Sequence, residues 1–349
     1  MIKSSPQEYL SKSEGMTLLD VRSPSEYAAG HVPGAINMPL FNDAERAEVG
    51  TLYKQAGRQQ SILKGLEVAG PKLAGFVQEA RRLAKGDRLF IHCWRGGMRS
   101  ANMAWLFELA GFEVVLLEGG YKAYRHYIRE QLGTFTNMVV LGGKTGSGKT
   151  SVIEHISRLG FQVLDLEGIA SHKGSAFGDL GQEFQPTNEQ FENDLYAEVA
   201  RLDPAKITFL EDESRGIGRI SIPDPFYSIM RSTELVFMDV PKKERINRLV
   251  KEYAGFPAER LAAAINRIAK KLGGLNCKLA LEALEADDFA TVADILLTYY
   301  DKAYLKGLSI RDQRKVSALP VDRDDPEANA RAVVAFFSEH LAGKVPAKV

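Results

Sequence analysis

Short apolar runs alternate along the chain with stretches whose apolar residues recur at helical spacing. Apolar runs that predict strands in the first third of the chain lie at residues 17–22, 88–91 and 112–117. A second series lies at residues 138–141, 161–167, 206–213 and 234–239. Helical patterns cover 67–84 and 101–110, with a break expected at Gly70 and Pro71. Alternating strands and helices favour an α/β fold with parallel sheets that are covered by helices on both faces.

This pattern changes twice along the chain and predicts a division into three parts. A polar junction at 133–137 ends the first series, so we expect a first α/β domain over residues 1–133. The second series predicts another α/β domain over 134–240. After Pro241 the pattern is helical to the end, so we expect a helical region over 241–349 that packs on the second domain.

A cysteine lies where the 88–91 strand ends and the 101–110 helix approaches. Gly96 and Gly97 allow backbone angles that turn successive N–H groups inward as an anion-binding nest, and the helix N-terminus adds positive charge. Arg99 adds a full charge, so Cys93 is the candidate nucleophile, with a thiolate favoured by its surroundings. A buried, inert cysteine is the alternative. We expect His92 to point the other way, into the core.

The run that follows the 138–141 strand matches G-x-x-x-x-G-K-[ST] and precedes a helical pattern. Strand, loop and helix in this order predict a phosphate-binding P-loop, in which backbone N–H groups hold phosphate oxygens. Lys149 would neutralise charge, and Thr150 would hold Mg²⁺. The expected binding residues are Gly143, Lys144, Thr145, Gly146, Ser147, Gly148, Lys149 and Thr150.

Acidic residues follow two strands of the second series and form a candidate acidic site. Asp165 follows one strand, and Glu211 or Asp212 at the end of the 206–213 run could act on Mg²⁺ or on a water molecule. The alternative is that some of these acids merely cap helices and have no catalytic role. We favour this interpretation for Glu213.

Two basic groups follow Pro241. Arg245 and Arg248 share one helix face, and Arg267 and Lys270 repeat the spacing. A solvated helix face is the ordinary explanation, and a lid over the P-loop phosphates or a surface for RNA are the functional ones. We expect at least one group to contact RNA phosphates.

Composition narrows the classes of protein without naming one. Lys plus Arg equals Asp plus Glu, 45 each, so net charge neither indicates nor excludes a nucleic-acid partner. The two cysteines, Cys93 and Cys277, lie in different halves, so we expect no disulfide and no cysteine metal site, and we expect Cys277 in a helical core. No apolar stretch is long enough for a bilayer, and the first residues lack the apolar core of a signal peptide. We therefore expect a cytoplasmic protein without a membrane partner.

The motifs over about residues 5–130 resemble the rhodanese family. They lie at 19–22, Glu26, 30–37, Cys93, 99–100 and 117–121. The resemblance implies that Cys93 carries a persulfide or perselenide. Five residues separate Cys93 from Arg99, whereas sulfur-transferring rhodaneses commonly have four. Five is the spacing of rhodanese-like phosphatases, which bind phosphate in this loop.

Over nearly the full length, the linked motifs are similar to the bacterial tRNA 2-selenouridine synthase family. The matching residues are 93–100, 143–150, 165–168, 171–178 and 209–215. This resemblance implies that wobble-position 2-thiouridine becomes 2-selenouridine: geranyl diphosphate alkylates the sulfur, and selenium from selenophosphate then displaces the geranylthio group. It also implies that the P-loop holds diphosphate rather than ATP, that no cofactor is tightly bound, and that the anticodon stem-loop of tRNA and selenophosphate synthetase are the partners.

Two other classes of function remain open at this point. One is a nucleotide-dependent regulatory binding module with an inert rhodanese-like domain, which would have no need of a thiol in a cationic nest. The other is an ATP-dependent phosphotransfer or sulfurtransferase fusion, which the five-residue spacing suggests and which would turn over ATP without tRNA.

Overall fold

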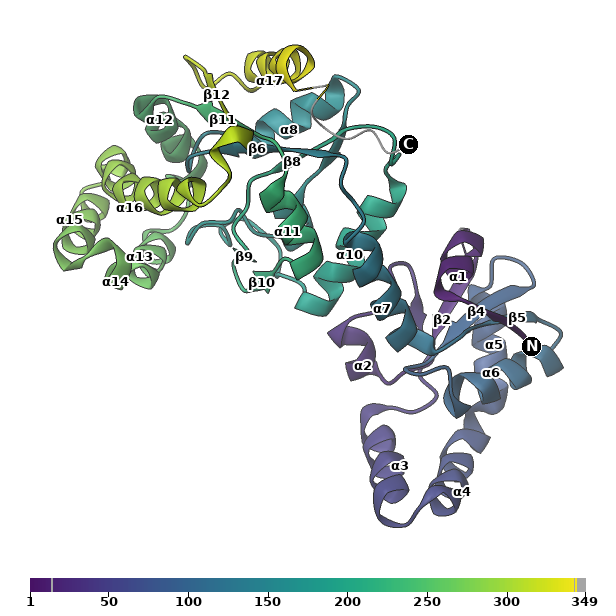
Figure 1. Cartoon of the computed structure of the whole chain (residues 1–349). Helices are drawn as coiled ribbons and strands as arrows, with labels where there is room; N and C mark the ends of the chain where they lie inside the picture. The colour runs from purple at the N-terminus through teal and green to yellow at the C-terminus, as the bar shows by residue number, and fades with distance from the viewer. Residues whose placement is uncertain (14, 342, 344–349) are drawn as a thin grey trace. The chain divides into compact units, whose positions relative to one another are not determined.

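The structure is a computed structural model that describes the chain except residues 14, 342 and 344–349. The chain forms two compact units, Met1–Gln131 and Leu132–Val349 (Figure 1). Each unit contains a five-stranded parallel sheet with helices on both faces, as the alternating pattern predicts. The second unit includes both the 134–240 and the 241–349 segments.

The sheet of the first unit has the strand order β1-β5-β4-β2-β3, and all neighbouring strands run parallel. The strands are β1 (Ile2–Ser4), β2 (Thr17–Asp20), β3 (Ile36–Asn37), β4 (Arg88–His92) and β5 (Glu113–Leu117). The three central strands are almost wholly buried, which is why each reads as a continuous apolar run in the sequence. The two edge strands are too short to leave such a signal.

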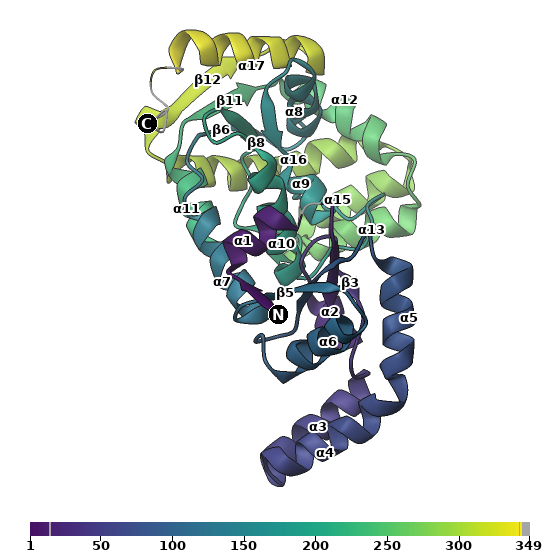
Figure 2. The same ribbon diagram turned by 90° about the vertical axis from the view of Figure 1, so that its right-hand side faces the viewer.

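The helices of the first unit lie on both faces of its sheet. They are α1 (Pro6–Lys12), α2 (Pro24–Ala29), α3 (Asp43–Gln55), α4 (Arg58–Ala69), α5 (Leu73–Leu83), α6 (Met98–Leu109) and α7 (Gly120–Leu132). The expected break at Gly70 and Pro71 is confirmed, since a 3₁₀ turn over Gly70–Lys72 separates α4 from α5. Both views show α3 and α4 as a helical pair that projects away from the sheet of this unit (Figures 1 and 2).

The sheet of the second unit has the strand order β12-β11-β6-β8-β7, again with every pair parallel. Its strands are β6 (Met138–Gly143), β7 (Gln162–Leu164), β8 (Thr208–Glu211), β11 (Leu235–Asp239) and β12 (Val316–Pro320). A separate two-stranded ribbon consists of β9 (Gly216–Ile217) and β10 (Ile220–Ser221). The P-loop follows β6, the central strand, so its backbone is supported from both sides.

Helices cover both faces of this second sheet. One face packs on α8 (Lys149–Arg158) and α17 (Pro326–His340). The other packs on α10 (Asn188–Arg201) and α11 (Asp224–Ser232), and the short α9 (Leu166–Ala170) contributes to the same core.

The region after Pro241 is helical as expected, except for β12. This strand pairs with β11 and completes the sheet, so the prediction of helix to the end is wrong over Val316–Pro320. Its residues are only half-buried or exposed, and the resulting mixed pattern hides the strand in the sequence. The remaining helices are α12 (Lys242–Tyr253), α13 (Ala258–Arg267), α14 (Ala269–Leu272), α15 (Gly274–Glu285) and α16 (Phe289–Ser309), of which the last four share a separate core that includes Cys277.

Candidate functional site

The loop that carries Cys93 packs against the turn that follows β5. Tyr121 N–H donates to the Cys93 carbonyl at 2.8 Å. Gly120 has φ +64°, and a Cβ there would overlap the Cys93 carbonyl and the Gly96 amide. Gly96 has φ +63°, a region that favours glycine. Two turns far apart in the sequence therefore hold the loop in one shape.

Cys93 lies at the base of this loop and is only 2% exposed. Its Sγ is 3.2 Å from the Ser100 hydroxyl, which also lies 3.2 Å from the carbonyl of Gly97. Ser100 is in the first turn of α6, so the sulfur faces the positive end of that helix, as the sequence predicts.

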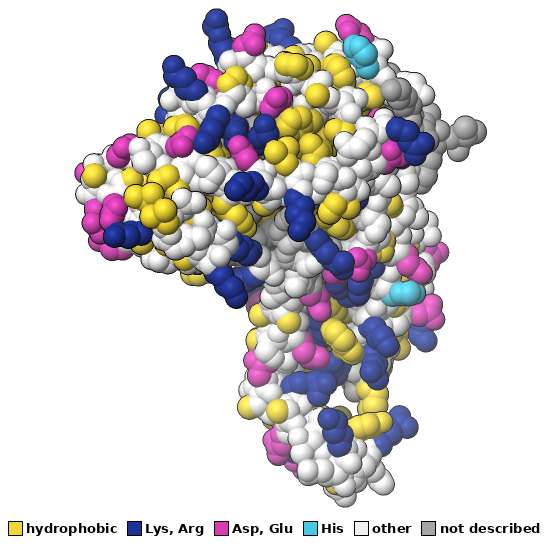
Figure 3. Space-filling view, turned by 60° about the vertical axis from the view of Figure 1, so that its left-hand side comes forward, with side chains coloured by type: hydrophobic (Ala, Val, Ile, Leu, Met, Phe, Trp, Pro, Cys, Tyr) yellow, Lys and Arg dark blue, Asp and Glu magenta, His cyan; other side chains and the backbone are white. Residues whose placement is uncertain are grey.

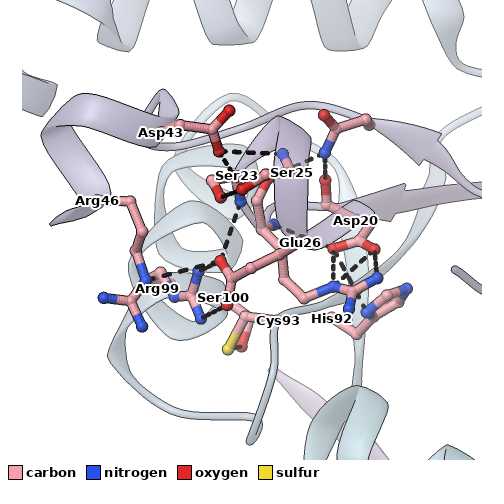
Figure 4. A network of polar contacts seen from close by, with 12 residues as sticks. Asp20, Ser23, Ser25, Glu26, Asp43, Arg46, His92, Cys93, Arg99 and Ser100 are labelled. Carbon is pink, nitrogen blue, oxygen red and sulfur yellow. Dashed lines mark hydrogen bonds and ion pairs between the residues drawn. The ribbon is translucent and has the colours of Figure 1, made fainter. Parts of the chain in front are cut away.

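Arg99 is not a free cation in this site (Figure 4). Its guanidinium donates to Glu26 at 2.5 Å and 3.2 Å, and Arg46 lies 3.6 Å from the same carboxylate. Glu26 is fixed because it accepts the backbone N–H of Ser23 as part of the capping box of α2. Burial raises the pKa of Glu26, but Arg99 and the other donors hold it below its ordinary value overall. Two arginines share one carboxylate, so this group keeps a net positive charge.

A buried ion pair lies in the same unit, beside the strand ends. Arg22 pairs with Asp20 at 2.6 Å, and its guanidinium stacks 3.8 Å from the centroid of the Tyr121 ring. Both charged side chains are fully buried, so we interpret the pair as a structural contact that holds the chain after β2 against Tyr121. His92 is in the core, as expected, with Asp20 3.7 Å away. Burial lowers the pKa of His92 to about 4, although Asp20 opposes the shift, so the ring is neutral at pH 7.

The P-loop connects β6 to α8 with the expected strand–loop–helix geometry. Gly148 caps α8 with φ +75°, and Gly146 has φ +79°. Lys149 turns back so that its Nζ donates to the Gly143 carbonyl at 3.4 Å. The Ser147 hydroxyl is buried without a partner among the described residues. The backbone N–H groups and these two side chains can therefore receive an anion. Lys144 is paired with Asp239 at 3.1 Å.

The acidic residues at the P-loop are different from those expected. The Thr150 hydroxyl donates to Glu167 at 2.7 Å, and Glu167 and Glu213 both line the cavity at the P-loop. Burial, and then the neighbouring Glu167, raise the pKa of Glu213 to about 8, while Lys149 opposes the shift. The interpretation of Glu213 as a cap is therefore wrong, because the chain turns after β8 and brings this carboxylate to Lys149.

The three acids that the sequence favoured have other surroundings. Asp165 caps α9 by accepting the Gly168 N–H at 2.7 Å. Glu211 is fully buried beneath the strand ends, accepts the Leu166 N–H at 3.2 Å, and has a pKa that burial raises well above its ordinary value. Asp212 lines the cavity, but its carboxylate is held by two arginines and a tyrosine hydroxyl, namely Arg311, Arg231 and Tyr304.

Arg245 and Arg248 do not form an exposed basic face, because both pack against the P-loop. Arg245 is 2% exposed and binds Asp301 at 2.8 Å and the Thr145 carbonyl at 3.1 Å. Arg248 donates to the hydroxyl of Ser151 on α8 and pairs with Asp324 and Glu252. Its guanidinium also lies where a Cβ on Gly148 would be. Their positions support the P-loop and match the lid alternative more closely than a tRNA surface.

The second basic group is divided between two environments. Arg267 pairs with Asp179 at 2.8 Å and, with Lys271, lines the cavity at the P-loop. Lys270 is exposed and is not part of the cavity wall. On the face in Figure 3, Lys and Arg side chains are interspersed with Asp and Glu and form no single basic patch.

A large cavity of about 1,420 Å³ extends from the P-loop toward the helical region. Besides the P-loop, residues of the 172–176 segment, α12 and α16 line it. Sequence reasoning missed this second wall, although the motif at 171–178 supplies part of it. Within the described residues, no group of three or more His, Cys, Asp or Glu side chains is placed to hold a metal ion, and no helix is long and apolar enough to cross a membrane.

Both units of the chain match known protein families. Residues 5–127 match the rhodanese-like domain, and residues 136–323 match the tRNA 2-selenouridine synthase AAA domain. A protein of Bdellovibrio bacteriovorus named tRNA 2-selenouridine synthase is 35% identical, over 85% of this chain and 90% of its own length. One of Bordetella petrii with the same name is 34% identical, over 91% and 95%. With a P-loop unit of this type joined to a cysteine-loop unit, the chain belongs to the tRNA 2-selenouridine synthase family.

Proposed function

We propose that this protein converts 2-thiouridine at the wobble position of tRNA to 2-selenouridine through an S-geranyl intermediate. The observation that carries the proposal is the presence of two different anion cradles in one family member: one holds a cysteine, and the other holds a lysine beside a large cavity. The names of the relatives supply the tRNA substrate and the selenium chemistry.

In the first step, the thiocarbonyl sulfur attacks carbon 1 of geranyl diphosphate. A carbon–sulfur bond forms, the carbon–oxygen bond breaks, and diphosphate leaves with the electron pair of that bond, while the N3 proton of the base is released to water. The P-loop amides and Lys149 stabilise the charge that develops on diphosphate. Arg248 donates to the Ser151 hydroxyl and so fixes the N-terminus of α8 beside the same group.

The residues beside the P-loop fit a magnesium ion. The Thr150 hydroxyl and Glu167 are already 2.7 Å apart, and Mg²⁺ in phosphate sites uses one or two carboxylates, waters and phosphate oxygens. When bound, the ion would supply further charge neutralisation to the departing diphosphate. Glu213 would then lose the proton that its raised pKa retains.

In the second step, selenium from selenophosphate attacks the ring carbon, geranylthiol leaves, and water takes the phosphoryl group. Alkylation matters because a thiol is a better leaving group than sulfide. We assign Cys93 the role of accepting the phosphoryl group from selenium: its thiolate attacks phosphorus, a sulfur–phosphorus bond forms, the phosphorus–selenium bond breaks, and water then hydrolyses the S-phosphocysteine. The sulfur lies in a loop that can bind anions and faces the N-terminus of α6. Selenophosphate would come from selenophosphate synthetase.

The tRNA would present its anticodon loop, whose single-stranded bases can be turned outward into a pocket. Arg267 and Lys270 remain our candidates for contacts with its phosphates. Arg245 is withdrawn from that role because it is buried and paired.

The test is mass analysis of nucleosides from tRNA that has been incubated with the full chain. With geranyl diphosphate alone, we expect S-geranyl-2-thiouridine to accumulate, and with selenophosphate added, we expect 2-selenouridine. Unchanged 2-thiouridine in both reactions, together with ATP turnover in the absence of tRNA, would instead support the ATP-dependent fusion.

A further inference from the structure

A second, smaller pocket lies in the helical region next to the P-loop. Its walls come from α12, α13, α15 and α16 and from the segment around Phe177. The side chains deepest in it are apolar: Leu261, Leu284, Val292, Ala293, Leu296 and Leu297. Protein interiors leave few such voids, because an unfilled apolar cavity costs stability.

This pocket adjoins the cavity at the P-loop. Five residues line both spaces: Thr145, Ser175, Leu249, Tyr253 and Tyr300. Thr145 belongs to the P-loop itself, so a ligand whose phosphates lie on the loop can extend directly into the pocket. Leu249 and Tyr253 are on α12, the helix that Arg245 fastens to the loop.

The chemistry of the walls selects an apolar group. The Tyr300 hydroxyl accepts the Ala176 N–H at 2.9 Å, and the Tyr253 hydroxyl is hydrogen-bonded with Ser175. The deep walls then offer no donor or acceptor side chain for a base or a ribose, whose polar groups would be buried at a cost. Dry apolar cavities of this kind bind hydrocarbon groups.

The size of the pocket fits one branched five-carbon unit. Its volume is about 60 Å³. A cavity needs about 10–15 Å³ to hold one water, so there is room for roughly four to six atoms of methylene size. The first carbons of a longer chain would lie between Thr145 and Leu249, in the space that the two cavities share.

We propose that this pocket, the prenyl pocket, binds the terminal isoprene unit of the alkyl diphosphate whose diphosphate lies on the P-loop. The proposal rests on the proposed function and adds the place of the hydrocarbon chain. It also assigns Ala293, a small residue in the deep wall, as the residue that limits chain length.

The test is titration calorimetry of the full chain with inorganic diphosphate, dimethylallyl diphosphate, geranyl diphosphate and ATP. Each buried methylene strengthens binding by about fourfold, so geranyl diphosphate should bind at least about tenfold more tightly than the five-carbon ester. In Ala293→Leu, the new side chain fills the pocket, and this preference should disappear while inorganic diphosphate binds as before. Ala290→Leu is the matched control, because Ala290 is exposed on the same helix.

The outcomes separate this inference from the proposed function. Equal affinity of the two prenyl esters for the unaltered chain, or equal losses for every ligand in Ala293→Leu, would overturn the prenyl pocket. Tighter binding of geranyl diphosphate without alkylation of tRNA would support the pocket and overturn the function. Binding of ATP in preference to geranyl diphosphate would overturn both.

Discussion

The Cys93 loop and the P-loop share one backbone arrangement, although we assign them to different steps of the reaction. Each follows a buried parallel strand, has a glycine at positive φ and leads into a helix N-terminus. The Cys93 loop is closed by a second turn at Gly120, and Arg99 in the helix that follows it is paired with Glu26. The P-loop opens into a cavity of about 1,420 Å³ whose wall holds carboxylates as well as cations.

The two loops differ in the segments and side chains that surround them. A closed loop with a sulfur at its base suits a small anion, because little else can enter. An open loop with Lys149, Thr150 and Glu167 at its edge suits a phosphate group that must arrive with a substrate and leave without it. The same strand–loop–helix motif therefore provides an anion-binding site in both units. The residues around each loop determine what the bound anion does in the reaction.

The largest expected effect is that of Cys93→Ser. Selenium incorporation should fall by at least about 1,000-fold, because the hydroxyl cannot replace the thiolate as the nucleophile that attacks phosphorus. Geranylation should persist, since the alkylation step uses no thiolate. Nucleoside mass analysis measures both steps, and Cys277→Ser, at a buried cysteine in the helical core, is the control. Normal 2-selenouridine formation by Cys93→Ser would contradict the assignment.

Lys149→Ala tests the other cradle. Geranylation should slow by about 100-fold, because the charge that stabilises departing diphosphate is removed. Selenation of tRNA that is supplied already geranylated should change much less, and Lys278→Ala, at an exposed lysine outside the cavity wall, should leave both steps intact. Equal loss of the two steps in Lys149→Ala would mean that they share one site.

Gly120→Ala should break the closed loop. The added Cβ overlaps the loop backbone at positive φ, so the first unit should lose about 3 kcal/mol of unfolding free energy. The two tryptophans, Trp94 and Trp105, both lie in this unit, and their fluorescence during urea unfolding measures its stability alone. Gly97→Ala is the control, because nothing lies within 4 Å of its Cβ position. Equal stability of the two variants would refute the close packing of these turns.

The smallest effect concerns Glu213. Its pKa in the folded chain is raised to about 8, so between about pH 4.5 and 8 the folded state retains a proton that the unfolded state loses. Stability of the second unit should therefore fall as pH rises through this range, and Glu213→Gln should flatten the slope by up to about 1.4 kcal/mol per pH unit. Hydrogen exchange of the amides in β8 measures this change. Exposed Glu259→Gln should leave the slope as it is.

The sequence predicted the parts of each site that lie within one motif. The Cys93 loop, the P-loop and their flanking strands were found because apolar runs and glycines mark them locally. The central strands of both sheets were recovered for the same reason.

Contacts between distant segments could not be predicted from local pattern. Nothing in the order of residues shows that Arg245 meets Asp301, or that Glu213 rather than Glu211 meets Lys149, since these depend on the turn after β8 and on the packing of α12 on α16. β12 was missed because a half-exposed edge strand has no continuous apolar run. The prenyl pocket arises from six helical and loop segments together, and no single segment indicates it.

The buried Arg245 limits how the second unit can be divided or recombined. One guanidinium joins the P-loop carbonyl of Thr145 to α12 and, through Asp301, to α16. A truncated chain that ended at residue 240 would leave the Thr145 carbonyl without this donor and would also lack β12 and α17. The phosphate site and the helices that follow it therefore form one structural unit that must be inherited together. A recombination event between them would lose the site, even if every residue of the P-loop motif were kept.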